Sequence, residues 1–304
     1  MATMTETPET VGKETPTHDY HAQAHVLSGH LKRPIEQKIE EQSPVTLNDR
    51  RGGHFTRFSQ HVSIEGLISF SKGKTRVSGS RSLKTNGWVT LATSILEGLN
   101  VLEVITAERI VSQVSTEHPY ENGHFPHVTF LGTQFTNLSV SGFPVALKLN
   151  FGICGKKPEG DRSYLQDLTF LNSVRQQTAK IANADGLPKD LKARYDERLA
   201  NVDRLIRQSR ENESHKDEPK VICSLVESIG EIPIPGVTSY GNVLVIPEFG
   251  SVALGEIEVG EKKYQDSERP TNYFELRAIS MQMGCIGDGA AQAATSAANG
   301  HHKP

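Results

Sequence analysis

The 304-residue sequence is poor in cysteine, in aromatic residues and in long apolar runs. Its longest uncharged, apolar-leaning stretch, Trp88 to Leu96, is far shorter than the roughly 18–20 residues of a membrane-spanning helix. Its 3 cysteines are too few for a disulfide-stapled scaffold. Its 33 basic and 36 acidic side chains leave a net charge of −3, which argues against a dedicated nucleic-acid binder.

Catalytic signatures are missing as well. The sequence contains no GxSxG nucleophile elbow, no SxxK motif and no HExxH zinc signature. Residues 287–292 begin like a GxGxxG phosphate-binding loop but lack its third glycine. We therefore predict no catalytic residue. Paired carboxylates of a glycosidase stay open, because only the tertiary fold brings them together.

The N-terminal segment, Met1 to Thr17, is rich in Thr, Pro and Glu and lacks the apolar stretch that a signal peptide needs. Such a segment cannot bury enough surface to offset the entropy of ordering it. We predict a disordered tail over residues 1–19 and, from the missing signal peptide, a cytoplasmic location.

Alternating and β-branched residues predict strands over most of the chain. Residues 58–71 alternate with an interruption at Gly66, which indicates a bulge or bend, and Gly98 is a turn signal. Further strand-like runs lie at 72–80, 88–96, 101–115, 127–140, 144–151, 221–229, 242–259 and 272–283. Several short strands with regular turn signals are typical of an antiparallel sandwich or barrel-like domain, and a solenoid shares the pattern.

Residues 161–216 have a helical pattern instead. Ser163 and Gln166 fit a capping box, and two stripes of apolar residues at helical spacing predict a hairpin of two amphipathic helices. Because strands flank this hairpin, we predict one discontinuous β domain, residues 20–155 and 220–286, with a helical hairpin insertion. Residues 287–304 are predicted to form an Ala/Gly-rich tail that can begin with a last strand or short helix.

Five segments fall into a recognisable order: GLNVLEVITAERIVSQVSTEH (98–118), VTFLGTQFTNLSVSGFPV (128–145), NVLVIPEFGSVALGEIEV (242–259), FELRAISMQM (274–283) and GDGAAQAATSAANG (287–300). This order resembles the bacterial choice-of-anchor P type of β-rich surface protein. The resemblance implies an all-β core and a place at the cell surface. It implies no functional residues, because that family has no established enzymatic activity. The chain departs from the family in lacking a signal peptide and a C-terminal anchor, and in its helical hairpin.

Histidine is the residue type in this sequence with the widest range of possible chemical roles, and the chain contains 12 histidines. His18, His21, His25 and His30 are predicted to lie on a polar N-terminal strand. Residues 117–127 combine His and Glu in a loop rich in Pro and Gly, and imidazole with carboxylate suits zinc or another borderline divalent metal. The candidate ligands are His118, Glu121, His124 and His127. The alternative is a plain connection between two strands.

Residues 66–96 contain no acidic side chain, whereas Lys72, Lys74, Arg76, Arg81 and Lys84 are basic. The first three alternate, so a strand would point them to one face. This face would contact an acidic polymer, a lipid headgroup or an acidic partner. Alternatively, the lysines protect an edge strand from aggregation.

The sequence thus predicts a non-catalytic, β-rich structural or interaction protein that self-associates or binds another protein and carries no cofactor. The alternative is a metal-dependent or carbohydrate-active protein that uses the loop 117–127. Expected partners are a second copy of the chain, another protein or, at 72–84, an acidic polymer. Neither nucleic acid nor a transmembrane segment is expected.

Overall fold

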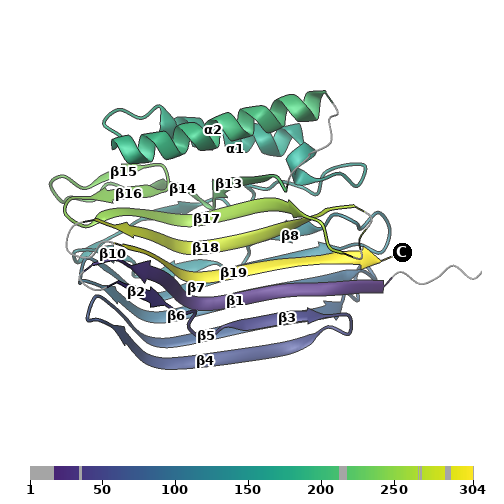
Figure 1. The fold of residues 1–304 in the computed structure, drawn as a ribbon, viewed down its shortest axis with the longest axis horizontal. Coiled ribbons are helices and arrows are strands. Elements are labelled where there is room, and N and C mark those ends of the chain that lie inside the picture. The colour runs from purple at the N-terminus through teal and green to yellow at the C-terminus, as the bar shows by residue number, and fades with distance from the viewer. Residues whose placement is uncertain are drawn as a thin grey trace, which may run out of the picture.

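The computed structural model describes residues 17–33, 36–211, 218–265, 267, 269–284 and 289–303. Two antiparallel sheets pack face to face, and a pair of helices lies along one side of them (Figure 1). The prediction of a mainly β, sandwich-like fold with a helical insertion is confirmed. No helix in the described part of the chain is long and apolar enough to cross a membrane.

Sheet A contains the first and the last of the described strands. Its strands are β1 (Thr17–Leu31), β2 (Gln37–Ile39), β3 (Val45–Asp49), β13 (Lys220–Ser224), β15 (Thr238–Tyr240), β16 (Val243–Ile246), β17 (Gly250–Lys262), β18 (Thr271–Met283) and β19 (Gly289–Lys303). Their order is β15-β16-β17-β18-β19-β1-β2, with β13 beside β17 and β3 beside β1.

Sheet B is built from the segment that follows β3. Its strands are β4 (Gly53–Ile64), β5 (Ile68–Arg81), β6 (Trp88–Val101), β7 (Ile105–His118), β8 (His127–Thr129), β9 (Gln134–Thr136), β10 (Ser139–Val140) and β11 (Phe143–Pro144). Its order is β11-β10-β7-β6-β5-β4, with β8 and β9 also beside β7. A separate pair joins β12 (Leu147–Leu149) to β14 (Val226–Ile229).

The C-terminal segment is a central strand of sheet A. The last strand predicted at the start of residues 287–304 is confirmed, but it extends over 289–303 in place of the predicted tail, because β19 pairs with β18 on one side and with β1 on the other. Small residues suit this crowded position: a Cβ atom on Gly300 would collide with the imidazole ring of His18. At the other end, residues 17–19 belong to β1 and not to a tail, whereas residues 1–16 lie outside the described residues.

Two tight turns between long strands differ from the sequence predictions. Glu65 and Gly66 have φ values of 49° and 67° and form the β4–β5 turn, so Gly66 marks a hairpin and not a bulge. Leu102 and Glu103, with φ values of 53° and 56°, turn β6 into β7, so the predicted strand 101–115 contains this turn. Two consecutive residues with positive φ form a turn whose twist matches the right-handed twist of the two flanking strands.

A line of irregular positions, which we call the phase line, crosses both sheets. Left-handed residues on this line are His61 (φ 50°), Gly98 (φ 66°), Gly255 (φ 62°) and Ala294 (φ 52°). The strand register is the same on both sides of the line. The alternation of buried residues nevertheless changes phase there, from even-numbered to odd-numbered positions within β5. Long strands such as β1, β5 and β18 therefore turn their other set of side chains inward beyond the line.

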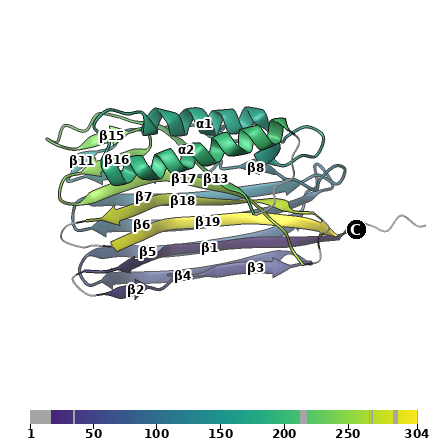
Figure 2. The ribbon, with the colours of Figure 1, turned by 45° about the horizontal axis from the view of Figure 1, so that its top comes forward.

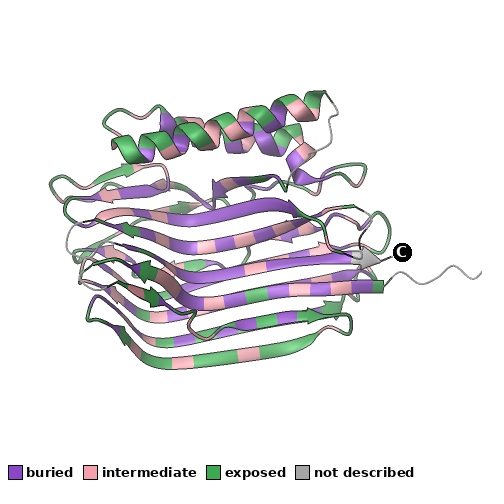
Figure 3. Cartoon of the chain, viewed as in Figure 1, coloured by how far each residue is buried: buried purple, intermediate pink, exposed green. Residues whose placement is uncertain are grey.

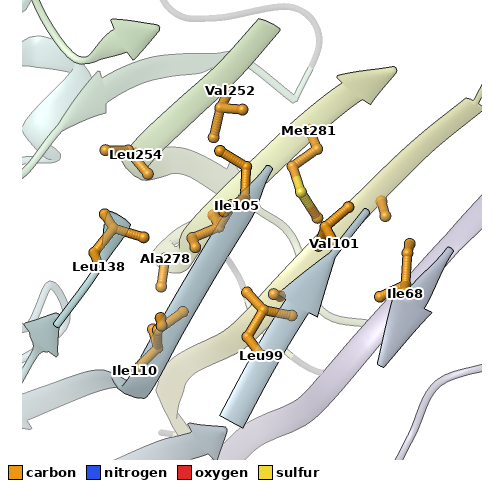
Figure 4. Close-up of a cluster of buried hydrophobic side chains, with 14 of the residues drawn as sticks. Ile68, Leu99, Val101, Ile105, Ile110, Leu138, Val252, Leu254, Ala278 and Met281 are labelled. Carbon is orange, nitrogen blue, oxygen red and sulfur yellow. The ribbon is translucent and has the colours of Figure 1, made fainter. Parts of the chain in front are cut away.

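The phase line separates two hydrophobic clusters. The first cluster is purely apolar and is shown in Figure 4, with side chains such as Ile105, Leu99 and Leu254 from both sheets. The second contains larger aromatic residues, among them Trp88 and Phe274. Buried side-chain contacts also bridge the sheets, including the pair Ser112 Oγ and Ser296 Oγ, which lie 2.6 Å apart. Burial on the inner faces of both sheets holds the sandwich together.

The helical segment contains a short 3₁₀ turn, η1 (Tyr164–Gln166), and the helices α1 (Leu168–Ala182) and α2 (Lys189–Arg210). Ser163 caps η1, and the α1 N-cap is Asp167, whose side chain accepts a hydrogen bond from Phe170 N at 2.8 Å. The capping box predicted at Ser163 and Gln166 thus marks the turn before α1. Figure 2 shows both helices lying along the top of the sandwich.

The helices share the core of the sandwich. Phe170, Leu171 and Val174 of α1 belong to the same buried cluster as Ile257 and Val259 of β17. The hairpin is an insertion in the sequence, yet its apolar face covers strands of sheet A. The predicted region extends to residue 216, and residues 212–217 lie outside the described residues.

Candidate functional site

The four predicted metal ligands face different neighbours. His118 is fully buried at the end of β7, and its Nδ1 donates a hydrogen bond to the Gly123 carbonyl at 2.8 Å. His124 Nε2 donates to the Pro270 carbonyl at 2.8 Å. Glu121 is exposed, and His127 begins β8 opposite Glu117. The structure thus places these residues near one another in the chain without aiming them at a common point.

No metal centre follows from this arrangement. Among the described residues, no group of three or more His, Cys, Asp or Glu side chains is placed to hold a metal ion. Burial lowers the pKa of His124, although its bond to the Pro270 carbonyl opposes that effect. His124 therefore ties the loop to the segment before β18 as a neutral hydrogen-bond donor, and the geometry gives the metal hypothesis no support.

His118 belongs instead to an aromatic cluster inside the sandwich. The His18 ring stacks on Trp88 with centroids 5.2 Å apart, and it lies 4.8 Å from the ring of His118. Tyr20 meets His18 edge-on at 4.8 Å. These residues pack where β1 crosses the ends of β6 and β7, so their role in the fold is to fill that end of the interior.

The basic strand predicted at 72–80 is β5. Its alternation is confirmed: Lys72, Lys74 and Arg76 are exposed, and the residues between them are buried. The edge-strand explanation is wrong, however, because β5 lies between β4 and β6. These three cations lie on the outer face of sheet B. The helices of the described residues, α1 and α2, lie along the top of the sandwich and not over this face (Figure 1).

Neighbours reduce the charge of this outer face. Glu97 of β6 stands directly opposite Lys72 in the register and also pairs with Arg109 of β7 at 3.9 Å. The Lys74 ammonium lies 5.4 Å from the centre of the Phe58 ring. The absence of acidic residues along β5 is therefore a property of the sequence that the fold partly offsets.

The other two predicted cations lie away from this group. The Arg81 guanidinium is 5.3 Å from the Trp88 ring, at the end of β5. Lys84 is exposed in the turn between β5 and β6. The five basic residues thus do not form a single binding surface, and only Lys72, Lys74 and Arg76 share one face.

The most exposed long strand is β4. It lies at the end of sheet B and pairs only with β5 within the described part of the chain. Most of its residues are exposed, as the green strand in Figure 3 shows. Phe55 and Phe58 are 50% and 69% exposed. Their spacing of three places them on opposite faces of the strand, so both faces of this edge carry an aromatic ring.

Sheet A has a contrasting outer face with charged groups that are largely buried. Glu258 accepts hydrogen bonds from Tyr273 at 2.7 Å, Arg277 at 3.1 Å and Lys220 at 3.2 Å. Burial acts to raise the pKa of Glu258, but these partners outweigh it and hold the pKa below its ordinary value. Nearby, Arg198 of α2 pairs with Glu256 at 2.9 Å, which ties the helix to β17. Each of these charged groups thus has a partner of opposite charge.

A polar cleft of about 450 Å³ lies next to this network, over the ends of β1 and β19. One wall carries Tyr264, whose ring stacks on His21 at 4.3 Å and on His301 at 4.5 Å. His21 Nε2 and His301 Nδ1 share a hydrogen bond of 2.9 Å. Burial, with help from the neighbouring His301, lowers the pKa of His21 to about 4. His21 is therefore neutral at neutral pH, and the cleft lining also contains the charged residues Glu218, Lys262 and Glu275.

The comparisons with known proteins give one result. The family model described as Domain of unknown function (DUF8256) matches residues 18–260. The chain belongs to this family. The range matched by the DUF8256 model begins in β1 and ends in β17, so it includes sheet B, the helical hairpin and part of sheet A, whereas β18 and β19 lie beyond it. Neither the search of curated proteins nor the search of solved structures returned a match.

Sequence reasoning missed two features of this DUF8256 protein. The alternation in β4 predicts a half-buried strand, although the spacing of Phe55 and Phe58 puts an apolar ring on each face and could have indicated the exposed edge. The cleft beside Tyr264 was missed because its parts come from both ends of the chain, and only the pairing of β1 with β19 unites them.

Proposed function

We propose that this protein is a non-catalytic interaction protein that self-associates edge to edge through β4. The observation that carries the proposal is the unpaired side of this long strand, which bears two exposed aromatic rings in the described part of sheet B. An edge strand presents a row of free backbone N–H and C=O groups that pair readily with another strand. A second copy of β4 offers a strand of the same length and pattern.

A two-fold axis through Phe58 gives the favoured pairing. In an antiparallel pair centred there, Phe58 faces its own copy, and Phe55 faces His61 of the other copy. Arg57 then faces Ser59, so no two like charges stand directly opposite each other. Cross-strand aromatic pairs contribute about 0.2–1 kcal/mol each, in addition to the backbone hydrogen bonds.

The other sheet ends favour a closed dimer over a filament. β11 and β15, at the opposite ends of the two sheets, have only 2 and 3 residues. An interface that uses the same edge of both copies closes on itself, and the described residues leave no long edge for a third copy. The dimer also joins the two outer faces that carry Lys72, Lys74 and Arg76, which makes a wider basic surface for an acidic polymer.

The test is the replacement of Phe58 by glutamate. The introduced carboxylate can pair with Lys74 of its own chain, which preserves the monomer, but the dimer would bring two such carboxylates face to face at the two-fold axis. Light scattering and native mass spectrometry should show a wild-type dimer and at least a tenfold weaker dimer for Phe58→Glu. The matched control is Leu83→Glu, because Leu83 is a fully exposed apolar residue in the β5–β6 turn, away from β4; its dimer should be unchanged.

Two results would overturn the proposal. One is a wild-type protein that stays monomeric at about 100 μM, where even a weak specific dimer forms. The other is an equal loss of the dimer in both variants, which would place the interface elsewhere. Thermal unfolding of the two variants checks that each monomer is folded.

A further inference from the structure

Two cysteines lie at the base of the helical hairpin. Cys154 follows β12 and precedes the first helical turn, and Cys223 lies in β13, after the second helix. Both side chains are buried, with 4% exposure each, and both belong to the same hydrophobic cluster. They are present as free thiols.

The local pairing of the chain brings the two segments together. Leu149 of β12 pairs with Val226 of β14, and the Asn150 amide donates a hydrogen bond of 2.7 Å to the Leu225 carbonyl. A short turn at 150–155 then leads the chain back toward β13. The thiols interact directly: the Cys223 thiol, followed by burial, raises the pKa of Cys154 well above its ordinary value.

We propose that Cys154 and Cys223 are a disulfide site that fastens the two ends of the helical hairpin to each other. A disulfide needs two cysteines whose side chains approach each other within a few ångströms, and sequence position alone does not provide this. Here the approach is set by the pairing of β12 with β14 next to the site and by the short turn at 150–155. The bond would close a loop that contains η1, α1, α2 and the start of β13.

The oxidant is a small disulfide such as oxidised glutathione. One cysteine thiolate attacks the glutathione disulfide, forms a mixed disulfide and releases one glutathione thiolate. The second cysteine thiolate attacks the mixed disulfide at its protein sulfur and releases the second glutathione. Two electrons pass from the cysteines to glutathione, and the two protons of the cysteine thiols end on the two released glutathiones.

The burial of both thiols determines when the bond forms. The thiolate is the reacting species, and a raised pKa together with a dry environment keeps a thiol unreactive. Oxidation of the native protein is therefore slow, whereas oxidation during folding, before α1 covers the site, is fast. Once formed, the bond restricts the unfolded chain, and it stabilises the protein most strongly against separation of the hairpin from the sheet.

The test refolds the full-length chain from denaturant with a mixture of reduced and oxidised glutathione. Peptide mapping without reduction should show a cross-link between Cys154 and Cys223, and thiol titration should show the loss of two of the 3 thiols. Reduction should then lower the Tm by about 5–10 °C. The same shift is expected for Cys285→Ala, which retains the pair, and no such shift for Cys154→Ala.

Two outcomes of the refolding experiment would contradict the disulfide site. Three free thiols after refolding, or a mixture of cross-links that includes Cys285, would overturn the proposal. To guard against poor refolding, native protein is also incubated with oxidised glutathione in dilute urea, which opens the hairpin region transiently. The absence of the Cys154–Cys223 cross-link in that second experiment would overturn the proposal too.

Discussion

The outer faces of the two sheets differ in what covers them. On sheet A, α2 lies beside β17, and the charged residues of β17 and β18 form a network that is mostly withdrawn from water. Sheet B has no helix over it, and its outer cations face solvent beside the edge strand β4. Both faces have the same alternating sequence pattern, so the difference comes from the tertiary environment and not from the strands themselves.

Two ion pairs make this contrast quantitative. The Arg277 and Glu258 side chains on sheet A are 18% and 8% exposed, whereas those of Arg109 and Glu97 on sheet B are 44% and 41% exposed. Breaking a buried pair leaves an uncompensated charge, while water replaces the partner of an exposed one. The same residue types therefore stabilise the protein by different amounts on the two sheets.

The strongest way to break the contrast is to delete residues 161–211 and bridge the gap with a short Gly/Ser linker. The deletion uncovers β17 and its charged neighbours, so that they face solvent as the outer face of sheet B does. The deletion removes Phe170, Leu171 and Val174, and the burial of each contributes about 1.5–3 kcal/mol. A typical domain has a free energy of unfolding of only about 5–15 kcal/mol. We expect no cooperative thermal transition in circular dichroism. A truncated chain that unfolds cooperatively near the wild-type Tm would show that the β sandwich does not need the hairpin.

A sharper comparison replaces one arginine on each sheet. Arg277→Met leaves Glu258 buried with two of its partners, and we expect a loss of about 2–4 kcal/mol in the free energy of unfolding. Arg109→Met, the matched change on sheet B, should cost no more than about 1 kcal/mol. Urea unfolding of both variants measures the difference. Equal losses would mean that the hairpin does not isolate the network from water.

The smallest expected effect concerns His21 on the outer face of sheet A. Its pKa is about 4 in the folded chain, below its ordinary value of 6.5. Between these values the unfolded chain binds a proton that the folded chain does not, so stability falls as the pH drops from 6.5 to 4. His21→Gln should remove roughly 1 kcal/mol of this pH dependence, after solvent screening is allowed for.

The control for this variant is His54→Gln, a change of an exposed histidine on β4 of sheet B. Its plot of Tm against pH should match that of the wild type. His25 and His124, whose pKa values burial also lowers, contribute in the same direction and remain in both variants. If His21→Gln has the wild-type slope between pH 4 and 6.5, the cleft does not hold His21 neutral.

Local patterns were sufficient to predict the class of fold. Alternation marked the strands of sheet B, and helical periodicity marked α1 and α2, because each pattern reflects one buried face. The failures arise where tertiary contacts override local preference. Alanine is a weak strand former, yet Ala290 to Ala298 form a strand because neighbours hydrogen-bond to both sides of it.

The candidate site was less predictable. His118, Glu121, His124 and His127 are close in sequence, but the direction of each side chain depends on a different partner. The phase line is hidden for a similar reason, since Ala294 is not a residue type that usually adopts a left-handed φ value. Only the packed sheets determine which residue takes that conformation.

The pairing of β1 with β19 has a consequence for how the protein is made. The long strands β4 to β7 follow one another through tight turns, so this part of sheet B can assemble while the rest of the chain is still being synthesised. Sheet A cannot be completed until its last strand has left the ribosome, because β19 fills the gap between β18 and β1. Contacts between distant residues form slowly. In the newly made chain, one edge of β18 and one edge of β1 therefore stay unpaired until the C-terminal residues of β19 have been synthesised.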